Sequence, residues 1–261
     1  MGRLSVLMTV LVLIVVPVQA QWLPPGHTVS PPAGGPRMLA NHTKFFSITT
    51  GDNSQETLRG AEVAGAAMQP IYRWNPGGRI IQSGIEGGIY SHFQTLANDV
   101  VLISTDFSVG IPIEIRAEAS GYRLKLLHIS SHLGDEFQMQ TGRTRISYSH
   151  ESLRGIYFHD LFRAGGRLYA GGEYAINMTP ETGDWIGIAG YELQGTTYFS
   201  TGDIRLRERN NWDPSIMIQV GYRIKDGAIK TGLEFFDGPL ATGQFFREKR
   251  SYVGIFFTFP A

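Results

Sequence analysis

Hydrophobic and polar side chains alternate along residues 100–116, VVLISTDFSVGIPIEIR. One side of the alternation is mostly apolar and carries Val101, Ile103, Thr105, Phe107, Val109, Ile111, Ile113 and Ile115. The other side carries Leu102, Ser104, Asp106, Ser108, Gly110, Pro112, Glu114 and Arg116. A period of two residues predicts a β-strand with one apolar and one polar face. The run is longer than the roughly 5–6 residues of a strand in a soluble sheet and exceeds the roughly 9–11 that cross a bilayer, so it predicts a membrane strand.

The same alternation recurs at 168–177, 216–225 and 229–235, and clusters of Gly, Pro and Asn mark turns between such segments. Counting the segments gives ten to twelve strands, and bacterial barrels have an even number. We therefore expect an all-β fold, an antiparallel up-and-down transmembrane β-barrel of about twelve strands, over residues 44–261. A soluble β-sandwich or lipocalin-like barrel remains the alternative, because alternation alone does not say which face is buried.

Charged residues fall on the polar faces of these strands. If the apolar faces meet lipid, one lumen receives Glu86, Asp106, Glu114, Arg116, Arg123, Lys125, Glu173, Glu192, Arg205, Arg207, Arg223 and Glu234. The mixed signs predict ion pairs that fill the lumen, and not a pore of a single sign. Arg205, Arg207 and Arg209 alternate on one strand, where they would line an anion path or pair with Glu173 and Glu192.

The composition supports a large β-structure and excludes one class of partner. The chain has no cysteine, 32 glycines, 11% aromatic and only 18% charged residues, which is typical of antiparallel β-structure without disulfides. Basic and acidic residues number 23 each, so no nucleic-acid partner is expected.

The two ends of the chain carry export features. An apolar run follows Arg3 and ends in small residues, which predicts a cleaved signal peptide over 1–20. Residues 21–43 are rich in Pro and Gly and predict a tether. The end, RSYVGIFFTFPA, is similar to the C-terminal signal that outer-membrane barrels present to their insertion machinery, although Pro260 and Ala261 follow the last aromatic residue. The expected location is the outer membrane of a Gram-negative-type bacterium, and the expected partners are its lipid and that machinery.

Five segments, SGIEGGIYSHF, STDFSVGIPIEIR, HISSHLGDEF, ISYSHESLRGIYF and GIFFTF, resemble in this order a bacterial family of exported β-barrels defined as a domain of unknown function, DUF1207. The resemblance spans roughly residues 34–259, and its most specific piece is the run from His128 to Glu136. It implies an outer-membrane barrel and no established reaction.

That run sets a histidine and a serine on one face of a predicted strand. If Arg123 and Lys125 point into the lumen, His128 and Ser130 point toward lipid, where an unpaired polar side chain is costly and usually functional. Imidazole can take the proton of a serine hydroxyl as it attacks an ester and return it to the leaving group. His128 is thus a candidate base and Ser130 a candidate nucleophile.

The His-x-Ser pattern is similar to one that two families of outer-membrane lipid hydrolases, the phospholipase A and lipid A deacylase families, place on an outward strand face. Those families have Asn after the serine, where this chain has Ser131, and an Asn or Glu on the neighbouring strand orients their histidine. A hairpin centred on residue 138 would set Tyr148 opposite His128. The resemblance leaves the third member open among Tyr148, Glu136 and Glu151.

Two classes of function remain. A β-bulge near residue 127 would turn His128 and Ser130 inward and make them part of a lumen network in a non-enzymatic barrel, either structural or a narrow channel. Without the bulge, a lipid ester hydrolase is the alternative. Ser131, His132, Asp135 and Glu136 are candidate binding residues. Asp135 and Glu136 are either solvated or offered to Ca²⁺, and no other cofactor or metal is expected.

Overall fold

A computed structural model describes residues 21–22, 41–49, 57–96, 99–161, 165–224 and 229–259. The predicted signal peptide and most of the predicted tether lie outside these residues. The strands are β1 (Gln21–Trp22), β2 (Asn41–Thr49), β3 (Thr57–Trp74), β4 (Arg79–Leu96), β5 (Asp99–Ala117), β6 (Ser120–Leu133), β7 (Tyr148–Asp160), β8 (Gly166–Thr179), β9 (Trp185–Gln194), β10 (Tyr198–Arg207), β11 (Pro214–Ile224), β12 (Ile229–Pro239) and β13 (Lys249–Phe259). Three short helices, α2 (Asp135–Thr141), η1 (Glu208–Asn210) and η2 (Gly243–Phe245), lie in connections.

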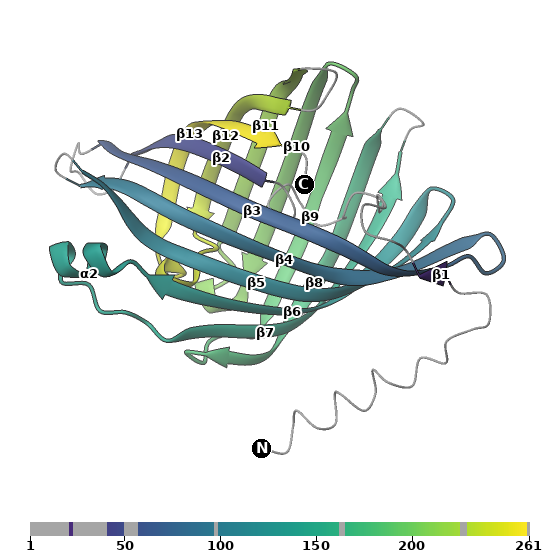
Figure 1. Ribbon diagram of the computed structural model, residues 1–261, viewed down its shortest axis with the longest axis horizontal. Coiled ribbons are helices and arrows are strands. Elements are labelled where there is room, and N and C mark those ends of the chain that lie inside the picture. The colour runs from purple at the N-terminus through teal and green to yellow at the C-terminus, as the bar shows by residue number, and fades with distance from the viewer. Residues whose placement is uncertain are drawn as a thin grey trace.

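The strands β2 to β13 form one closed antiparallel barrel (Figure 1). Each strand pairs with the next along the chain, and β13 pairs with β2, which closes the ring. The two-residue β1 adds to β3 at Tyr72 and Arg73. The predicted twelve-stranded up-and-down barrel is confirmed. Among the described residues, no helix has the length and hydrophobicity that would let it cross a membrane.

The barrel has two different rims. At one rim, here the short-turn rim, the connections are brief: 75–78, 118–119, 161–165 and 195–197. The opposite rim, the long-loop rim, carries α2 in the connection 134–147, η1 in 208–213 and η2 in 240–248. Transmembrane barrels of bacteria have short periplasmic turns and longer extracellular loops.

The outer wall is apolar along the middle of the strands. Val109, Leu124, Leu153 and Leu233 are each about half exposed although all are aliphatic. Aromatic pairs flank this band. Tyr122 and Tyr157 pack with ring centroids 5.1 Å apart near the short-turn rim, and Tyr174 and Trp185 with centroids 4.9 Å apart toward the long-loop rim. An apolar band between two aromatic girdles is the outer surface of a membrane barrel.

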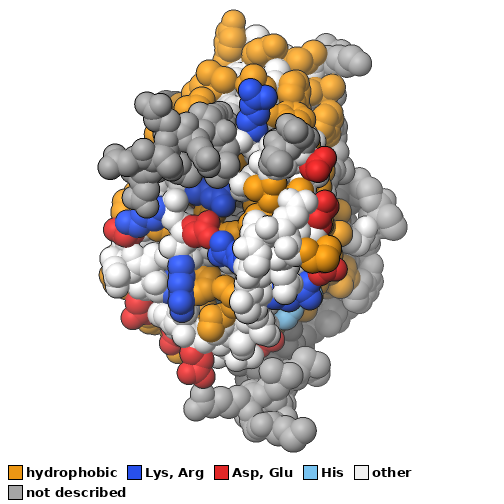
Figure 2. Space-filling view, turned by 90° about the vertical axis from the view of Figure 1, so that its left-hand side faces the viewer, with side chains coloured by type: hydrophobic (Ala, Val, Ile, Leu, Met, Phe, Trp, Pro, Cys, Tyr) orange, Lys and Arg blue, Asp and Glu red, His pale blue; other side chains and the backbone are white. Residues whose placement is uncertain are grey.

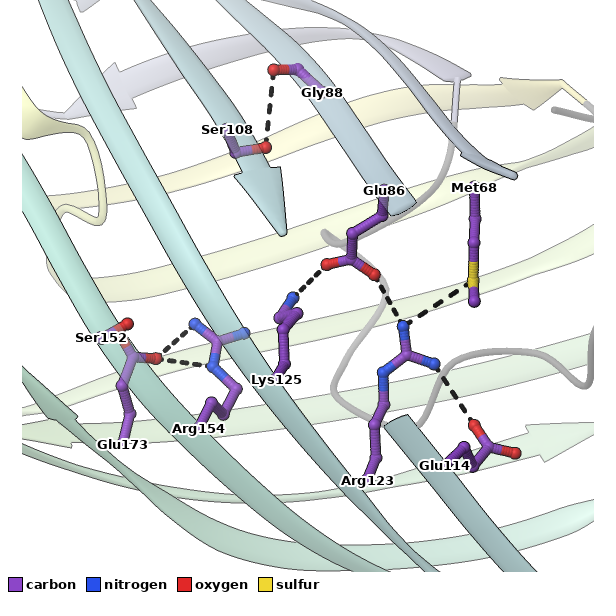
Figure 3. A network of polar contacts seen from close by, with 10 residues as sticks. All are labelled: Met68, Glu86, Gly88, Ser108, Glu114, Arg123, Lys125, Ser152, Arg154 and Glu173. Atoms are coloured by element: carbon purple, nitrogen blue, oxygen red, sulfur yellow. Dashed lines mark hydrogen bonds and ion pairs between the residues drawn. The ribbon is translucent and has the colours of Figure 1, made fainter. Parts of the chain in front are cut away.

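Ion pairs fill the lumen (Figure 3). Glu86 of β4 binds Arg123 Nη2 at 2.7 Å and also Lys125, both from β6, and Arg123 Nη1 reaches Glu114 at 3.3 Å. Glu173 of β8 accepts from Arg154 Nε at 2.6 Å. Each of these side chains is at most 5% exposed. The predicted inward direction of the charges and their mixed signs are therefore confirmed, and the lumen at this level is packed with side chains.

Two bulges change the predicted facing of single residues. The β4–β5 pairing shifts between His92 and Phe93, so Val101 and Ile103 point inward at 0% and 3% exposure. Their assignment to the outer face was wrong. They lie at the long-loop rim, where a hydrophobic cluster with Leu133, Phe137 and Phe245 buries them. A second shift, at Glu151 and Ser152 of the β7–β8 pairing, turns Asn177 to the exposed side, although the alternation placed it inward.

Candidate functional site

His128 and Ser130 lie on the outer wall of β6. The pairing of β6 with β5 and with β7 runs without a register shift across the described residues of both ladders. The interpretation of a bulge near residue 127 was therefore wrong. Leu127 points into the lumen and is 2% exposed, and its neighbour His128 points out. Leu127 lines a lumen cavity in which Ile103 and Phe245 also lie.

Glu151 stands directly opposite His128 on β7. Its Oε1 lies 3.5 Å from His128 Nδ1, and its Oε2 accepts a hydrogen bond of 3.1 Å from Asn177 Nδ2 on β8. A chain of three polar side chains thus crosses β6, β7 and β8 on the outer wall. A carboxylate at Nδ1 stabilises an imidazolium and fixes the tautomer that leaves Nε2 free to accept a proton.

Ser130 shares the outer face with His128 and stands opposite Ser149. The described part of the structure contains no hydrogen bond between Ser130 and His128. The Cα atoms of residues i and i+2 on a strand are roughly 6–7 Å apart. Toward the short-turn rim, the next outward residue of β7 is Leu153 of the apolar band, which pairs with Tyr174 of the aromatic girdle. The two residues therefore sit at the boundary of the apolar band.

Tyr148 does not belong to this constellation. It pairs with Ser131, points inward at 6% exposure, and accepts a hydrogen bond of 2.8 Å from Arg209 Nη1. The prediction that Tyr148 stands opposite His128 was wrong. The connection 134–147 contains α2 and does not form a tight hairpin. The pairing of β6 with β7 is therefore displaced by three residues from the expected register.

Ser131 and His132 face opposite sides of the wall. Ser131 is buried in the lumen, where its hydroxyl donates to Asp106. His132 is exposed on the outer wall, with its ring edge to face against Phe107 at 5.8 Å. The two residues are therefore separated by the barrel wall and do not bind a common group.

Asp135 and Glu136 form the first turn of α2 and are exposed. Asp135 pairs with Arg145, and Glu136 accepts a hydrogen bond of 3.1 Å from Gln140. In the described ranges, no three His, Asp or Glu side chains come together as a metal site. Calcium binding at the two carboxylates stays a prediction.

The connection 240–248 crosses the mouth of the lumen, and we call it the strap. Four strands separate β12 from β7 on one side of the ring, and three separate β13 from β5 on the other. The strap nevertheless reaches β5–β7. Gln244 Nε2 donates to the carbonyl oxygens of Ser131 and Ile146 at 2.9 and 2.8 Å, and Gly243 N donates to Asp106 Oδ2 at 3.2 Å. Phe245 packs against Phe137 of α2.

Sequence patterns gave no sign of the strap's role. LATGQFFRE has the appearance of an ordinary loop, and its only unusual feature is the pair Phe245 and Phe246, both 2% exposed. Gln244 is 1% exposed, which is rare for a glutamine in a connection. The contact across the ring was invisible because it joins segments about a hundred residues apart.

Comparisons with known proteins place the chain in a family and give its fold. A family model described as "Protein of unknown function (DUF1207)" matches residues 8–260. No curated protein matches the chain. Among solved structures, outer membrane phospholipase A from Escherichia coli is similar at 10% identity and a TM-score of 0.57, over 90% of this chain and 95% of that one. The Salmonella typhi outer membrane phospholipase, a dimer with bound calcium, is 11% identical at a TM-score of 0.59, over 90% and 94%. At these identities the likeness shows the fold alone.

Proposed function

Since the chain belongs to the DUF1207 family, whose description gives no activity, we propose that it is an integral outer-membrane barrel with a closed lumen and a non-enzymatic, structural role. The observation that carries this proposal is the strap. It spans the mouth from β12–β13 to the opposite wall, and Gln244 locks it to the main chain there.

Packing below the strap supports the closed lumen. The charged side chains that fill the interior are at most 8% exposed, which is incompatible with the water-filled channel of a porin. The members are Lys44, Glu62, Glu86, Asp106, Glu114, Arg123, Lys125, Arg154, Arg167, Glu173, Asp203, Arg207 and Glu234. The face that bears α2 shows charged side chains of both signs among hydrophobic ones across its centre (Figure 2). A narrow channel is therefore the less favoured form of the role.

The apolar outer wall supports lipid as the surrounding partner, and the unequal rims support an orientation with the long-loop rim outside the cell. The predicted signal peptide over 1–20 and the aromatic final strand fit export and barrel insertion. Ion conductance of the protein, refolded into planar bilayers, tests the closed lumen: a flat baseline is expected, and a stable unitary step would refute it.

A second candidate function, a lipid ester hydrolase on the outer wall, is favoured by the contact between His128 and Glu151. Because Glu151 contacts Nδ1 of His128, the Nε2 atom of His128 can serve as the base for Ser130 once the serine side chain turns toward it. The aromatic girdle marks the level at which lipid headgroups meet hydrocarbon, which is where the ester of an outer-leaflet lipid would lie. The similar fold of a phospholipase adds no more than the scaffold.

Hydrolysis by the refolded protein of phospholipid vesicles, and of lipid A in mixed vesicles, with and without Ca²⁺, tests this second function. Release of fatty acid that disappears in Ser130→Ala and His128→Ala would establish it. No release from either lipid by the folded wild type would dismiss it and leave the structural role.

A further inference from the structure

Arg207, at the end of β10, is a buried cation that has no carboxylate partner among the residues the structure describes. It is 3% exposed, and of its five N–H groups one on Nη1 donates to Ser215 Oγ at 2.8 Å. No ion pair joins Arg207 to any residue that the structure describes. Glu173, a partner considered from the sequence, binds Arg154 and His150 instead. A guanidinium taken out of water is costly unless an anion compensates it.

The neighbouring arginines do not supply that anion. Arg205 Nε binds Asp203 Oδ1 at 2.7 Å, and Asp203 Oδ2 accepts a further hydrogen bond of 2.9 Å from Tyr169, so this carboxylate is already engaged. Arg209 donates to Tyr148 Oη and lies 5.0 Å from the ring centroid of Phe246, again with no carboxylate among the described residues. The strand end therefore holds more positive than negative charge.

Two adjoining cavities lie beside these arginines under the strap. The smaller, about 10 Å³, is lined by Arg205, Arg207, Asp203 and Ser215 among others, and has room for one water-sized group. The larger, about 130 Å³, shares Arg205 and Ala241 with it. The smaller cavity, which Arg207 lines, is thus next to the larger one, so a carboxylate oxygen in the first and an apolar body in the second would occupy neighbouring spaces.

The larger cavity has room for an apolar body between charged groups. Its hydrophobic lining includes Phe46, Ile103, Leu127, Leu240, Phe245 and Tyr252, and Glu62, His92, Asp106, Arg154, Arg205 and Arg250 also line it. An apolar cavity of about 150 Å³ is known to hold benzene, so the present one fits a single ring or a short acyl chain. Thr242 of the strap also lines it, 8% exposed, and within the described ranges its Oγ1 has no hydrogen-bond partner. A hydrogen-bonding group of a ligand would satisfy it.

We propose that this lumen site binds a small organic monocarboxylate, whose carboxylate pairs with Arg207 beside Arg205 and whose apolar body fills the larger cavity against the strap. The site lies inside the closed barrel, under the strap, and uses none of the residues of the outer-wall constellation. The proposal gives the lumen a ligand class. It also explains why hydrophobic side chains line the lumen, since a lumen filled only by ion pairs does not need them.

Calorimetric titration of the refolded protein with sodium benzoate tests the proposal, beside benzyl alcohol as the neutral analogue of matched size and sodium chloride as the bare anion. Benzoate is expected to bind saturably and to raise the unfolding temperature. Arg207→Gln, which keeps a donor for Ser215, is expected to weaken benzoate binding at least ~30-fold. Arg223→Gln, at the short-turn rim, is the matched control and should bind as the wild type does.

Folding of Arg207→Gln is checked by its own unfolding temperature without ligand, which should not fall, because the variant removes an uncompensated buried charge. Equal benzoate affinity in Arg207→Gln and wild type would overturn the proposal. So would equal binding of benzyl alcohol, which would show an apolar cavity without charge recognition. Chloride binding without benzoate binding would also overturn it, since the site would then be one for a bare anion.

Discussion

Gln244 Nε2 donates a hydrogen bond of 2.9 Å to the main-chain oxygen of Ser131, and this contact joins opposite walls of the barrel. Gln244 belongs to the strap between β12 and β13, whereas Ser131 lies near the end of β6. The same side chain also donates to Ile146 O and accepts from Ile146 N at 3.0 Å. A single amide therefore satisfies three main-chain groups at the mouth of the lumen.

Gln244→Ala is expected to lower the free energy of unfolding by about 2–4 kcal/mol, because it leaves buried main-chain groups of Ser131 and Ile146 unsatisfied. Urea unfolding of the protein refolded into vesicles measures the change. Gln140→Ala removes an exposed glutamine of α2 and should change it by no more than about 0.5 kcal/mol. Equal stability of the two variants would mean that the strap is not anchored by Gln244.

Glu86→Ala is expected to destabilise the barrel by about 3–5 kcal/mol, because it leaves Arg123 and Lys125 buried without their shared carboxylate. The double variant Glu86→Ala with Lys125→Ala should recover part of the loss, since one of the two uncompensated charges is gone. Both are measured by urea unfolding in vesicles, beside Glu181→Ala, at an exposed residue of the connection 180–184, as control. Additive losses in the double variant would contradict the ion-pair account of the lumen.

Val220→Arg, on the outer face in the middle of β11, is expected to cost about 2–4 kcal/mol in a bilayer. Trp185→Arg, on the outer face where β9 begins, should cost only about 0–1 kcal/mol, because the penalty falls toward the interface. The comparison is made by unfolding in vesicles. A cost that is equal at the two positions would argue against a bilayer around this wall.

Glu151→Gln tests the outer-wall constellation. If the protein hydrolyses lipid esters, the loss of the carboxylate at His128 Nδ1 should lower kcat by roughly 10²–10⁴ while substrate binding changes little. Ser149→Ala, opposite Ser130, and Tyr148→Phe, on the lumen side, are the matched controls and should retain activity. An active Glu151→Gln enzyme at the wild-type rate would remove Glu151 from the mechanism.

The fold was predictable because successive side chains of a barrel strand alternate between two environments. A residue in a barrel strand faces either lipid or lumen, so the alternation at 100–116 and the charges at Glu86, Arg123 and Glu173 were enough to assign the two faces. The alternation failed at Ile103 and Asn177, where bulges insert a residue into one strand. A bulge is decided by both strands of a pair, so the single pattern could not contain it.

The candidate site was predictable in part, since the outward direction of His128 and Ser130 follows from the inward direction of Arg123 and Lys125. The partner of His128 was not fixed by the sequence, because register across a connection depends on how many residues the connection takes up. Because the connection 134–147 contains α2, the residue opposite His128 is Glu151 and not Tyr148. The strap could not be predicted at all, since its anchor Gln244 meets β6 only after the ring has closed.

The closed lumen is tested most directly by the conductance of single refolded proteins in a planar bilayer in concentrated KCl. The wild type is expected to give no conductance steps, whereas a variant with residues 241–247 replaced by two glycines and with Glu86, Arg123 and Lys125 changed to alanine should give them. Stable steps from the wild type would contradict the account, because ions would then be passing both the strap and the ion pairs beneath it.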